Sequence, residues 1–177
     1  MPTHAELAAA VRDACHLTGE FTLRSGATAT EYFDKFCFEA RPDLLAAVAD
    51  ALASLVPDGV EVLAGLELGG IPIVTMLSQV TGLPAVFVRK QAKDYGTCQL
   101  AEGGEIDGRR LTVVEDVVTT GGQVLLSCAD LRARGAVVDT VLCVIDREAG
   151  GPAAFAAIGL ALRPLFTMTE LKAAAVP

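Results

Sequence analysis

The stretch that decides the fold runs from Leu111 to Gln123 and reads LTVVEDVVTTGGQ. Its apolar first half predicts a buried strand, and the small residues that follow predict a turn into a helix beginning at Gly122. Two adjacent carboxylates, Glu115 and Asp116, come at the end of the predicted strand. In the Thr-Thr-Gly-Gly turn, backbone N–H groups and two hydroxyls converge at a helix N-terminus, where the helix dipole favours an anion. The stretch therefore predicts a phosphate site beside carboxylates suited to a sugar diol, or to a metal bound to it. The alternative is an ordinary strand-turn-helix corner with solvated acids.

Segments of the same kind lie on both sides of this stretch. Apolar patterns predict strands over residues 60–66, 84–88, 110–114 and 137–145, and helices over 42–55, 70–81 and 122–134. Alternating strands and helices with short glycine-bearing turns are typical of a parallel sheet covered on both faces. We therefore expect an α/β fold, in which ligands bind beyond the carboxyl ends of the strands.

The N-terminal segment has a different pattern. The spacing of Thr3 and Glu6 predicts a capping box that opens a helix, which we expect to stop at Gly19. Short strands are expected over residues 21–23 and 32–38, around a Ser-Gly turn. No repeat, low-complexity tract or linker divides the chain. We expect one domain over residues 1–177, with an N-terminal hood over about 1–40 and a core over about 41–177.

The connection from Arg89 to Arg109 is unusually long and has no apolar periodicity. It contains four glycines, and Arg89, Lys90 and Lys93 cluster at its start. Long loops in compact domains are usually functional or disordered. We expect residues 89–104 to be a mobile loop that brings cations to an anionic ligand; a solvated basic loop with no partner is the alternative.

Composition excludes several classes of protein. The chain has 177 residues, of which 52% are hydrophobic, and its 14 basic and 22 acidic residues give a formal charge of −8. This balance argues against a broad nucleic-acid or anionic-membrane surface. The two histidines lie near the N-terminus, which leaves little from which to build a catalytic triad or a multi-histidine metal site. Five cysteines without C-x-x-C spacing, together with the lack of a signal or membrane-spanning pattern, favour a cytoplasmic protein.

The quoted stretch resembles the thirteen-residue phosphoribosyl pyrophosphate motif of the type I phosphoribosyltransferases. Three further segments resemble the orotate phosphoribosyltransferases within that family. Residues 21–26 are similar to the motif F-x-L-[KR]-S-G, residues 89–96 to the mobile loop R-K-x-x-K-x-H-G, and residues 145–148 to a D-R-x-E corner. These segments follow the family order from about residue 20 to 150, so the resemblance covers most of the chain.

The resemblance implies transfer of a phosphoribosyl group from phosphoribosyl pyrophosphate to orotate, giving orotidine 5′-monophosphate and pyrophosphate in pyrimidine synthesis. It assigns catalysis to Lys93, Arg89 and Asp116, and orotate binding to Thr119, Arg147, Tyr32 and Phe33. It assigns phosphoribosyl pyrophosphate binding to Arg24, Arg89, Lys90, Lys93, Tyr95, Glu115, Asp116, Val117, Val118, Thr119, Thr120, Gly121, Gly122 and Gln123.

The resemblance also implies a cofactor and a partner. Mg²⁺ is expected to be held mostly by substrate oxygens, with Asp116 touching it through water. A homodimer is expected, in which loop 89–104 of one subunit completes the neighbouring site. Among the predicted contacts, Arg147 has the alternative role of a salt bridge with Glu148 or Asp146. Tyr32 and Phe33 have the alternative role of core aromatics.

Some positions depart from the family pattern. Tyr95 stands where a histidine is usual, Ala29 where a serine is common, and Leu68-Gly69 where some members have Tyr-Lys. These departures leave open a phosphoribosyltransferase for another base. A phosphoribosyl pyrophosphate-binding regulator without turnover is a second alternative, although such a protein has no need for leaving-group cations on a mobile loop. Arg147 favours orotate, because a purine base has no carboxylate for it to bind.

Overall fold

In the computed structural model, the described residues are 2–22, 26–91 and 99–174. A six-stranded sheet with the order β5-β4-β3-β6-β7-β8 forms the centre, and all its neighbouring strands are parallel except the short pair β4 and β5. Its strands are β3 (Val62–Leu66), β4 (Ala85–Val88), β5 (Ala101–Glu102), β6 (Arg110–Val118), β7 (Val137–Asp146) and β8 (Ala161–Thr167). The predicted α/β class with a mostly parallel sheet is confirmed.

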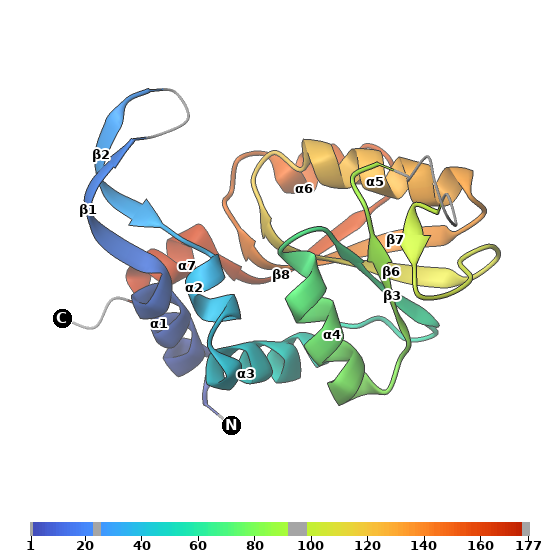
Figure 1. Cartoon of the computed structure of the whole chain (residues 1–177), viewed down its shortest axis with the longest axis horizontal. Coiled ribbons are helices and arrows are strands. Elements are labelled where there is room, and N and C mark those ends of the chain that lie inside the picture. The colour runs from blue at the N-terminus through green and yellow to red at the C-terminus, as the bar shows by residue number, and fades with distance from the viewer. Residues whose placement is uncertain (1, 23–25, 92–98, 175–177) are drawn as a thin grey trace.

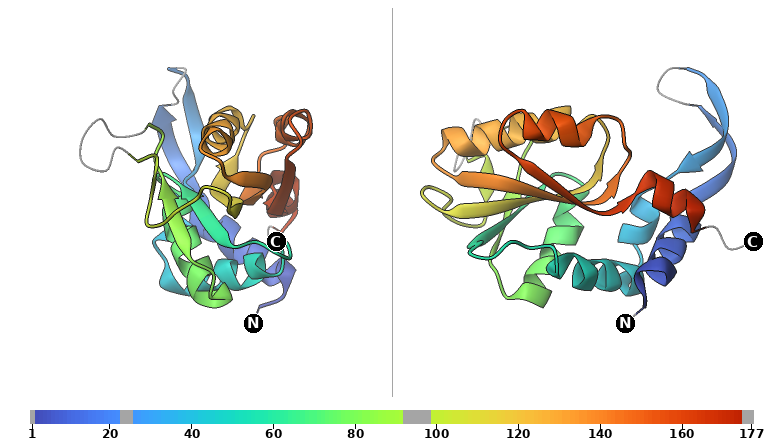
Figure 2. Two further views of the ribbon diagram at one scale, coloured as in Figure 1. Left: turned by 90° about the vertical axis from the view of Figure 1, so that its right-hand side faces the viewer. Right: turned by 180° about the vertical axis from the view of Figure 1, so that it is seen from behind.

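Helices cover both faces of this sheet (Figures 1 and 2). On one face lie α3 (Pro42–Ala53) and α4 (Gly70–Thr81), and on the other α5 (Gly122–Ala133) and α6 (Gly151–Ala156). Successive residues of β3 alternate between the two resulting cores: Leu63 packs in the first, whereas Val62 and Ala64 pack in the second. The two faces are both apolar because crossover helices exclude water from each of them.

The N-terminal region combines a small helical cluster with a projecting hairpin. The helices α1 (His4–Cys15), α2 (Phe36–Glu39) and α7 (Met168–Ala173) lie together beside α3. Strands β1 (His16–Thr22) and β2 (Thr28–Phe33) pair antiparallel and extend away from the body as a two-stranded ribbon (Figure 1). Among the described residues, no helix combines the length and the apolar character that a membrane crossing requires.

Several boundaries in this region differ from expectation. The strands expected over residues 21–23 and 32–38 are found at His16–Thr22 and Thr28–Phe33. The first helix ends at Cys15 rather than at Gly19, because His16 and the residues after it pair with β2. Residues 36–38, predicted as part of a strand, form α2 instead, and the Asp34 carboxylate accepts the backbone N–H of Phe36 at 3.0 Å near its start. Strand pairing and a local side-chain bond therefore override the simple apolar pattern.

Four elements were not predicted: β5, α6, β8 and α7. The short strand β5 lies inside the long connection 89–109 and pairs with β4, so this connection is not wholly irregular. Strand β6 is also longer than predicted, since it continues to Val118 and includes Glu115 and Asp116.

Candidate active site

The turn from β6 into α5 forms one wall of the candidate site. Pairing with β7 holds β6 straight as far as Val118, and α5 begins at Gly122. Between them Gly121 has φ +80°, and a Cβ at this position would lie 2.6 Å from the ring of Phe155. The turn therefore depends on a glycine for its conformation and for its packing. It leaves the N–H groups of the first turn of α5 without intrahelical acceptors.

A cavity of about 400 Å³ opens in front of this turn. The β6–α5 turn meets three other segments there: Lys35 and Phe36 at the start of α2, the turn after β3 at Leu68 and Gly69, and the end of β4 at Arg89 and Lys90. Predicted phosphoribosyl pyrophosphate residues that line this cavity are Arg89, Lys90, Glu115, Val117, Val118, Thr119, Thr120, Gly121, Gly122 and Gln123. We call it the phosphoribosyl cavity.

The two adjacent carboxylates have different positions. Glu115 lines the phosphoribosyl cavity together with Val117. Asp116 does not line it: its side chain is 0% exposed, and its carboxylate forms an ion pair with Lys35. The reason is the alternation of side chains along β6, which puts neighbouring residues on opposite faces. In this structure Glu115 therefore faces the phosphoribosyl cavity and Asp116 faces Lys35. The contacts expected of both carboxylates with phosphoribosyl pyrophosphate, and of Asp116 with Mg²⁺ through water, stay predictions.

The carboxylates around Asp116 are shifted toward their protonated forms. Burial, and then hydrogen bonding with Asp116 and its negative charge, raise the pKa of Glu115 to about 9. Burial, and then the charge of Asp116, raise the pKa of Glu39 to about 8. At neutral pH, Glu115 is therefore a neutral carboxyl group that can both donate and accept hydrogen bonds. Such a group suits a sugar hydroxyl and adds no negative charge to a site for phosphates.

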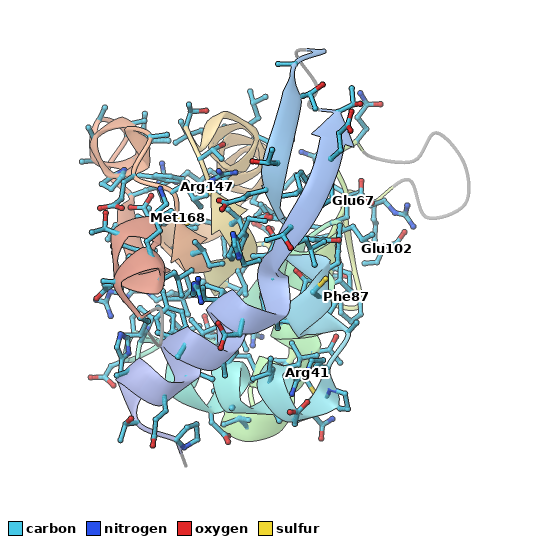
Figure 3. All side chains as sticks on the ribbon, turned by 90° about the vertical axis from the view of Figure 1, so that its left-hand side faces the viewer. Arg41, Glu67, Phe87, Glu102, Arg147 and Met168 are labelled. Atoms are coloured by element: carbon cyan, nitrogen blue, oxygen red, sulfur yellow. The ribbon has the colours of Figure 1, made fainter. Side chains whose placement is uncertain are left out.

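The stem of the long connection is held by carboxylates. Nε of Arg89 lies 3.3 Å from an oxygen of Glu102, and the backbone N–H of Lys90 donates to Glu67 at 2.6 Å. Glu67 and Glu102 lie on the same side of the molecule, next to this connection (Figure 3). The Arg89 guanidinium and the Lys90 backbone are thus held at the cavity wall. The predicted contacts Arg24, Lys93 and Tyr95 lie outside the described residues.

A second cavity of about 250 Å³ adjoins the first. All four residues predicted to bind orotate line it: Tyr32, Phe33, Thr119 and Arg147. They come from β2, from the turn after β6 and from the residue after β7. We call it the base cavity. It shares Lys35, Phe36, Val117 and Thr119 with the phosphoribosyl cavity.

Arg147 is available to a ligand. The alternative salt bridges are not formed, since Asp146 accepts the N–H of Glu148 at 2.8 Å and Glu148 accepts from both the N–H and the hydroxyl of Thr169. Within the described part of the chain, no carboxylate forms an ion pair with the Arg147 guanidinium. Arg147 also borders a further cavity of about 400 Å³ with Met168, and Figure 3 shows both next to the hairpin.

Sequence reasoning missed Lys35, Phe36 and Glu67, all of which line the phosphoribosyl cavity. Lys35 had a detectable signal, because it is one of only four lysines and lies two residues after the predicted aromatic contact Phe33. Glu67 had none, since its role at the stem depends on the spatial neighbourhood of β3 and β4.

The donor set indicates what kind of metal ion fits this site. Among the described residues, no group of three or more His, Cys, Asp or Glu side chains is arranged to hold a metal ion. The phosphoribosyl cavity nevertheless offers the hydroxyls of Thr119 and Thr120, and the Glu115 carboxyl, which would have to release its proton to bind a metal ion. Mg²⁺ keeps several waters and commonly binds through substrate phosphates with one or two carboxylates. These residues therefore fit an ion carried in by an anionic substrate.

Comparisons with known proteins identify the family of this chain. The family profile described as "Phosphoribosyl transferase domain" matches residues 38–154. Orotate phosphoribosyltransferase of Nocardioides sp. is 56% identical over 174 residues, covering 98% of this chain and 97% of that protein. Orotate phosphoribosyltransferase of Methanocella arvoryzae is 44% identical, covering 86% and 87%.

Solved structures give the same result. The chain matches orotate phosphoribosyltransferase of Mycobacterium tuberculosis in complex with Fe(III) dicitrate with a TM-score of 0.87, at 35% identity, covering 96% of this chain and 99% of that one. The complex of the M. tuberculosis enzyme with 5-phospho-α-D-ribosyl 1-diphosphate matches with a TM-score of 0.82, at 32% identity, covering 97% and 99%. The chain therefore belongs to the phosphoribosyltransferase family and, within it, to the orotate phosphoribosyltransferases.

Proposed function

We propose that this protein transfers the 5-phosphoribosyl group of phosphoribosyl pyrophosphate to orotate, giving orotidine 5′-monophosphate and pyrophosphate for pyrimidine synthesis. The observation that carries the proposal is the pair of adjoining cavities. One is bounded by the turn at the N-terminus of α5, and the other by Arg147 and two aromatic side chains. Transfer between two ligands requires that both lie in contact, and cavities with a shared border provide this.

The phosphoribosyl cavity supports binding of the substrate phosphate and ribose. The N–H groups and hydroxyls at Thr119 and Thr120, with the first turn of α5, suit the 5-phosphate. The neutral carboxyl of Glu115 suits a ribose hydroxyl. Because these groups belong to a strand and a helix joined by a tight turn, the site is largely formed before the substrate arrives.

The leaving pyrophosphate gains negative charge as its bond to the ribose carbon breaks. Cations therefore have to lie next to the pyrophosphate to stabilise this charge. Arg89 and Lys90 border the phosphoribosyl cavity. We assign the main stabilising charge to Lys93, with further contacts from Tyr95 and Arg24. Closure of loop 89–104 over the substrate would also exclude water, which strengthens these electrostatic contacts.

The base cavity supports recognition of orotate. The guanidinium of Arg147 can bind the orotate carboxylate in a bidentate manner. Tyr32 and Phe33 supply apolar contacts for the ring, and Thr119 stands on the border toward the ribose. As the ring nitrogen forms its bond to the ribose carbon, the bond from that carbon to pyrophosphate breaks, and the proton of the nitrogen passes to water or to the departing pyrophosphate.

Mg²⁺ bound to the substrate would neutralise phosphate charge. In this chain, Glu115 and the hydroxyls of Thr119 and Thr120 are the groups that would contact the ion. Asp116 would act indirectly, by holding neighbouring residues of the cavity in position.

We further propose that the chain is one domain with a hood over about 1–40, works in the cytoplasm, and acts as a homodimer in which loop 89–104 completes the neighbouring site. The exposed apolar side chain of Leu68, which lines the phosphoribosyl cavity, supports an interface at this place. Mixing Lys93→Ala subunits with Glu115→Ala subunits tests the shared site. We expect activity to recover on mixing, because one of the two sites in each hybrid dimer is then intact. A verified hybrid dimer that remains inactive would exclude a shared site.

The activity is tested by supplying phosphoribosyl pyrophosphate and Mg²⁺ with orotate, uracil, adenine or hypoxanthine, and measuring pyrophosphate release. Orotate and uracil form a matched pair, since they share the ring and differ in the carboxylate. We expect turnover of orotate and at least about 100-fold lower kcat/KM for uracil, because a site built for a charged group rejects an analogue that lacks it. Turnover of a purine base but not of orotate would overturn the proposal.

A further inference from the structure

Lys35 occupies the border between the two cavities. It lies between β2 and α2, and it is among the four residues that line both the phosphoribosyl cavity and the base cavity. Its side chain is 34% exposed, and its ammonium group lies 5.1 Å from the centre of the Phe36 ring. No role in phosphoribosyl transfer was assigned to it above.

The partner of Lys35 is Asp116, which touches three segments of the site. One oxygen of Asp116 accepts the backbone N–H of Val117, at the end of β6. The other oxygen pairs with Lys35 and fills the space where a side chain of Gly69 would be: a Cβ there would lie 1.5 Å from it. Asp116 therefore holds together the base of the hood, the turn after β3 and the last residues of β6.

This arrangement depends on a counter-ion. The Asp116 side chain is 0% exposed, and an unpaired carboxylate at such a position is strongly destabilised by the loss of water. Within the described residues, Lys35 is the cation that forms an ion pair with Asp116. The Asp116 carboxylate accepts the N–H of Val117, and Val117 lines both cavities. A shift of this carboxylate would therefore move a wall that the two cavities share.

We propose that Lys35 is a positioning residue for phosphoribosyl transfer, which acts through Asp116 to fix the shared wall of the two cavities. This inference rests on the proposed function. It predicts that Lys35 matters for both substrates at once, because the segment it holds borders both cavities. It also predicts that Lys35 has no further effect once the Asp116 charge has been removed.

The test is a double-mutant cycle of Lys35→Met, Asp116→Asn and the double variant, with Lys35→Arg as the conservative replacement. Lys172→Met is the matched control, since it removes an exposed lysine outside both cavities. We measure kcat and KM for both substrates, and phosphoribosyl pyrophosphate binding by calorimetry. We expect Lys35→Met and Asp116→Asn each to lower kcat/KM by about 10- to 100-fold, Lys35→Arg to stay within about 5-fold of wild type, and the control to be unchanged.

The decisive comparison is Asp116→Asn against the double variant. If Lys35 acts through Asp116, the two differ by less than about 3-fold in kcat/KM and in the dissociation constant. A further loss of 10-fold or more in the double variant would overturn the inference, because Lys35 would then touch substrate independently. Wild-type activity in Lys35→Met or in Asp116→Asn would overturn it as well.

The same set of variants distinguishes a folding defect, and a failure of the proposed function, from a failure of this inference. If Lys35→Met alone does not fold, the comparison of Asp116→Asn with the double variant still decides, because neither leaves a buried unpaired charge. Circular dichroism verifies folding. If the wild-type protein does not use orotate, the proposed function fails by itself; calorimetry with phosphoribosyl pyrophosphate then still tests whether Lys35 acts through Asp116.

Discussion

The phosphoribosyl cavity and the base cavity are built in different ways. One continuous stretch, residues 115–124 with only Asp116 turned away, supplies much of the phosphoribosyl cavity. The base cavity takes its walls from β2, from the segment after it, from the turn after β6 and from the residue after β7. The phosphoribosyl cavity can therefore be predicted from a short sequence motif. The base cavity forms only where segments that are distant in the sequence meet. Lys35, Phe36, Val117 and Thr119 line both cavities and so connect them. Variants that affect one cavity and leave the other unchanged test this difference.

The largest effect is expected for Lys93→Ala, which tests the leaving-group side of the phosphoribosyl cavity. Loss of a cation that meets charge developing in the transition state should lower kcat by about 100- to 1,000-fold, with less effect on substrate binding. Steady-state kinetics with calorimetry of phosphoribosyl pyrophosphate measures both. Equal losses in kcat and in binding would mean that Lys93 is only an anchor.

Gly121→Ala should cost about 100-fold in kcat/KM and about 2 kcal/mol in stability, because φ +80° strains alanine and its Cβ would meet the Phe155 ring at 2.6 Å. Gly59→Ala is the matched control: it has φ +77° but nothing within 4 Å of the added Cβ. Urea unfolding and kinetics compare the two variants. Similar stability losses in both would show that the packing against Phe155 contributes little.

Arg147→Ala tests the base cavity alone. Loss of a hydrogen-bonded ion pair with the orotate carboxylate is worth about 1.5–3 kcal/mol, so kcat/KM for orotate should fall by about 10- to 100-fold. The KM for phosphoribosyl pyrophosphate should change by less than about 3-fold. Arg134→Ala, an exposed arginine outside both cavities, controls for the loss of charge. An equal rise in both KM values would contradict the separation of the two cavities.

The smallest effect is expected at the capping box of α7, far from the shared border. Hydrogen bonds from the backbone and hydroxyl of Thr167 hold the pKa of Glu170 below its ordinary value. A carboxylate with a lowered folded pKa stabilises the fold above its unfolded pKa, and this contribution is lost as pH falls through the folded pKa. Glu170→Ala should therefore cost about 0.5 kcal/mol at neutral pH and almost nothing near pH 3.

Urea unfolding of wild type and Glu170→Ala at both pH values measures this difference, with the exposed Glu105→Ala as control. Catalytic constants at neutral pH should not change. A stability difference that persists unchanged at low pH would exclude the ionised carboxylate as its source.

Local patterns predicted much of the core. The helix Gly70–Thr81 has the predicted bounds, and β3, β4, β7, α3 and α5 lie within one or two residues of expectation at each end. In the N-terminal region the predicted boundaries were wrong where strand pairing decides the local structure. His16 continues into a strand because Phe33 lies opposite it, and this contact spans seventeen residues of sequence. The missed α7 did carry a local signal, since Thr167 and Glu170 have capping-box spacing.

The sequence by itself determined the α/β class, the strand-turn-helix at residues 111–123, and four of the residues that line the base cavity, the last through family resemblance. These features depend on apolar periodicity, on glycines and on short motifs, all of which act within a few residues. Only the tertiary structure decided that Asp116 turns inward to Lys35 while Glu115 faces the phosphoribosyl cavity, and that no carboxylate of the described residues forms an ion pair with Arg147. Burial and ion pairing depend on which distant segments meet, and the packed fold alone brings those segments together.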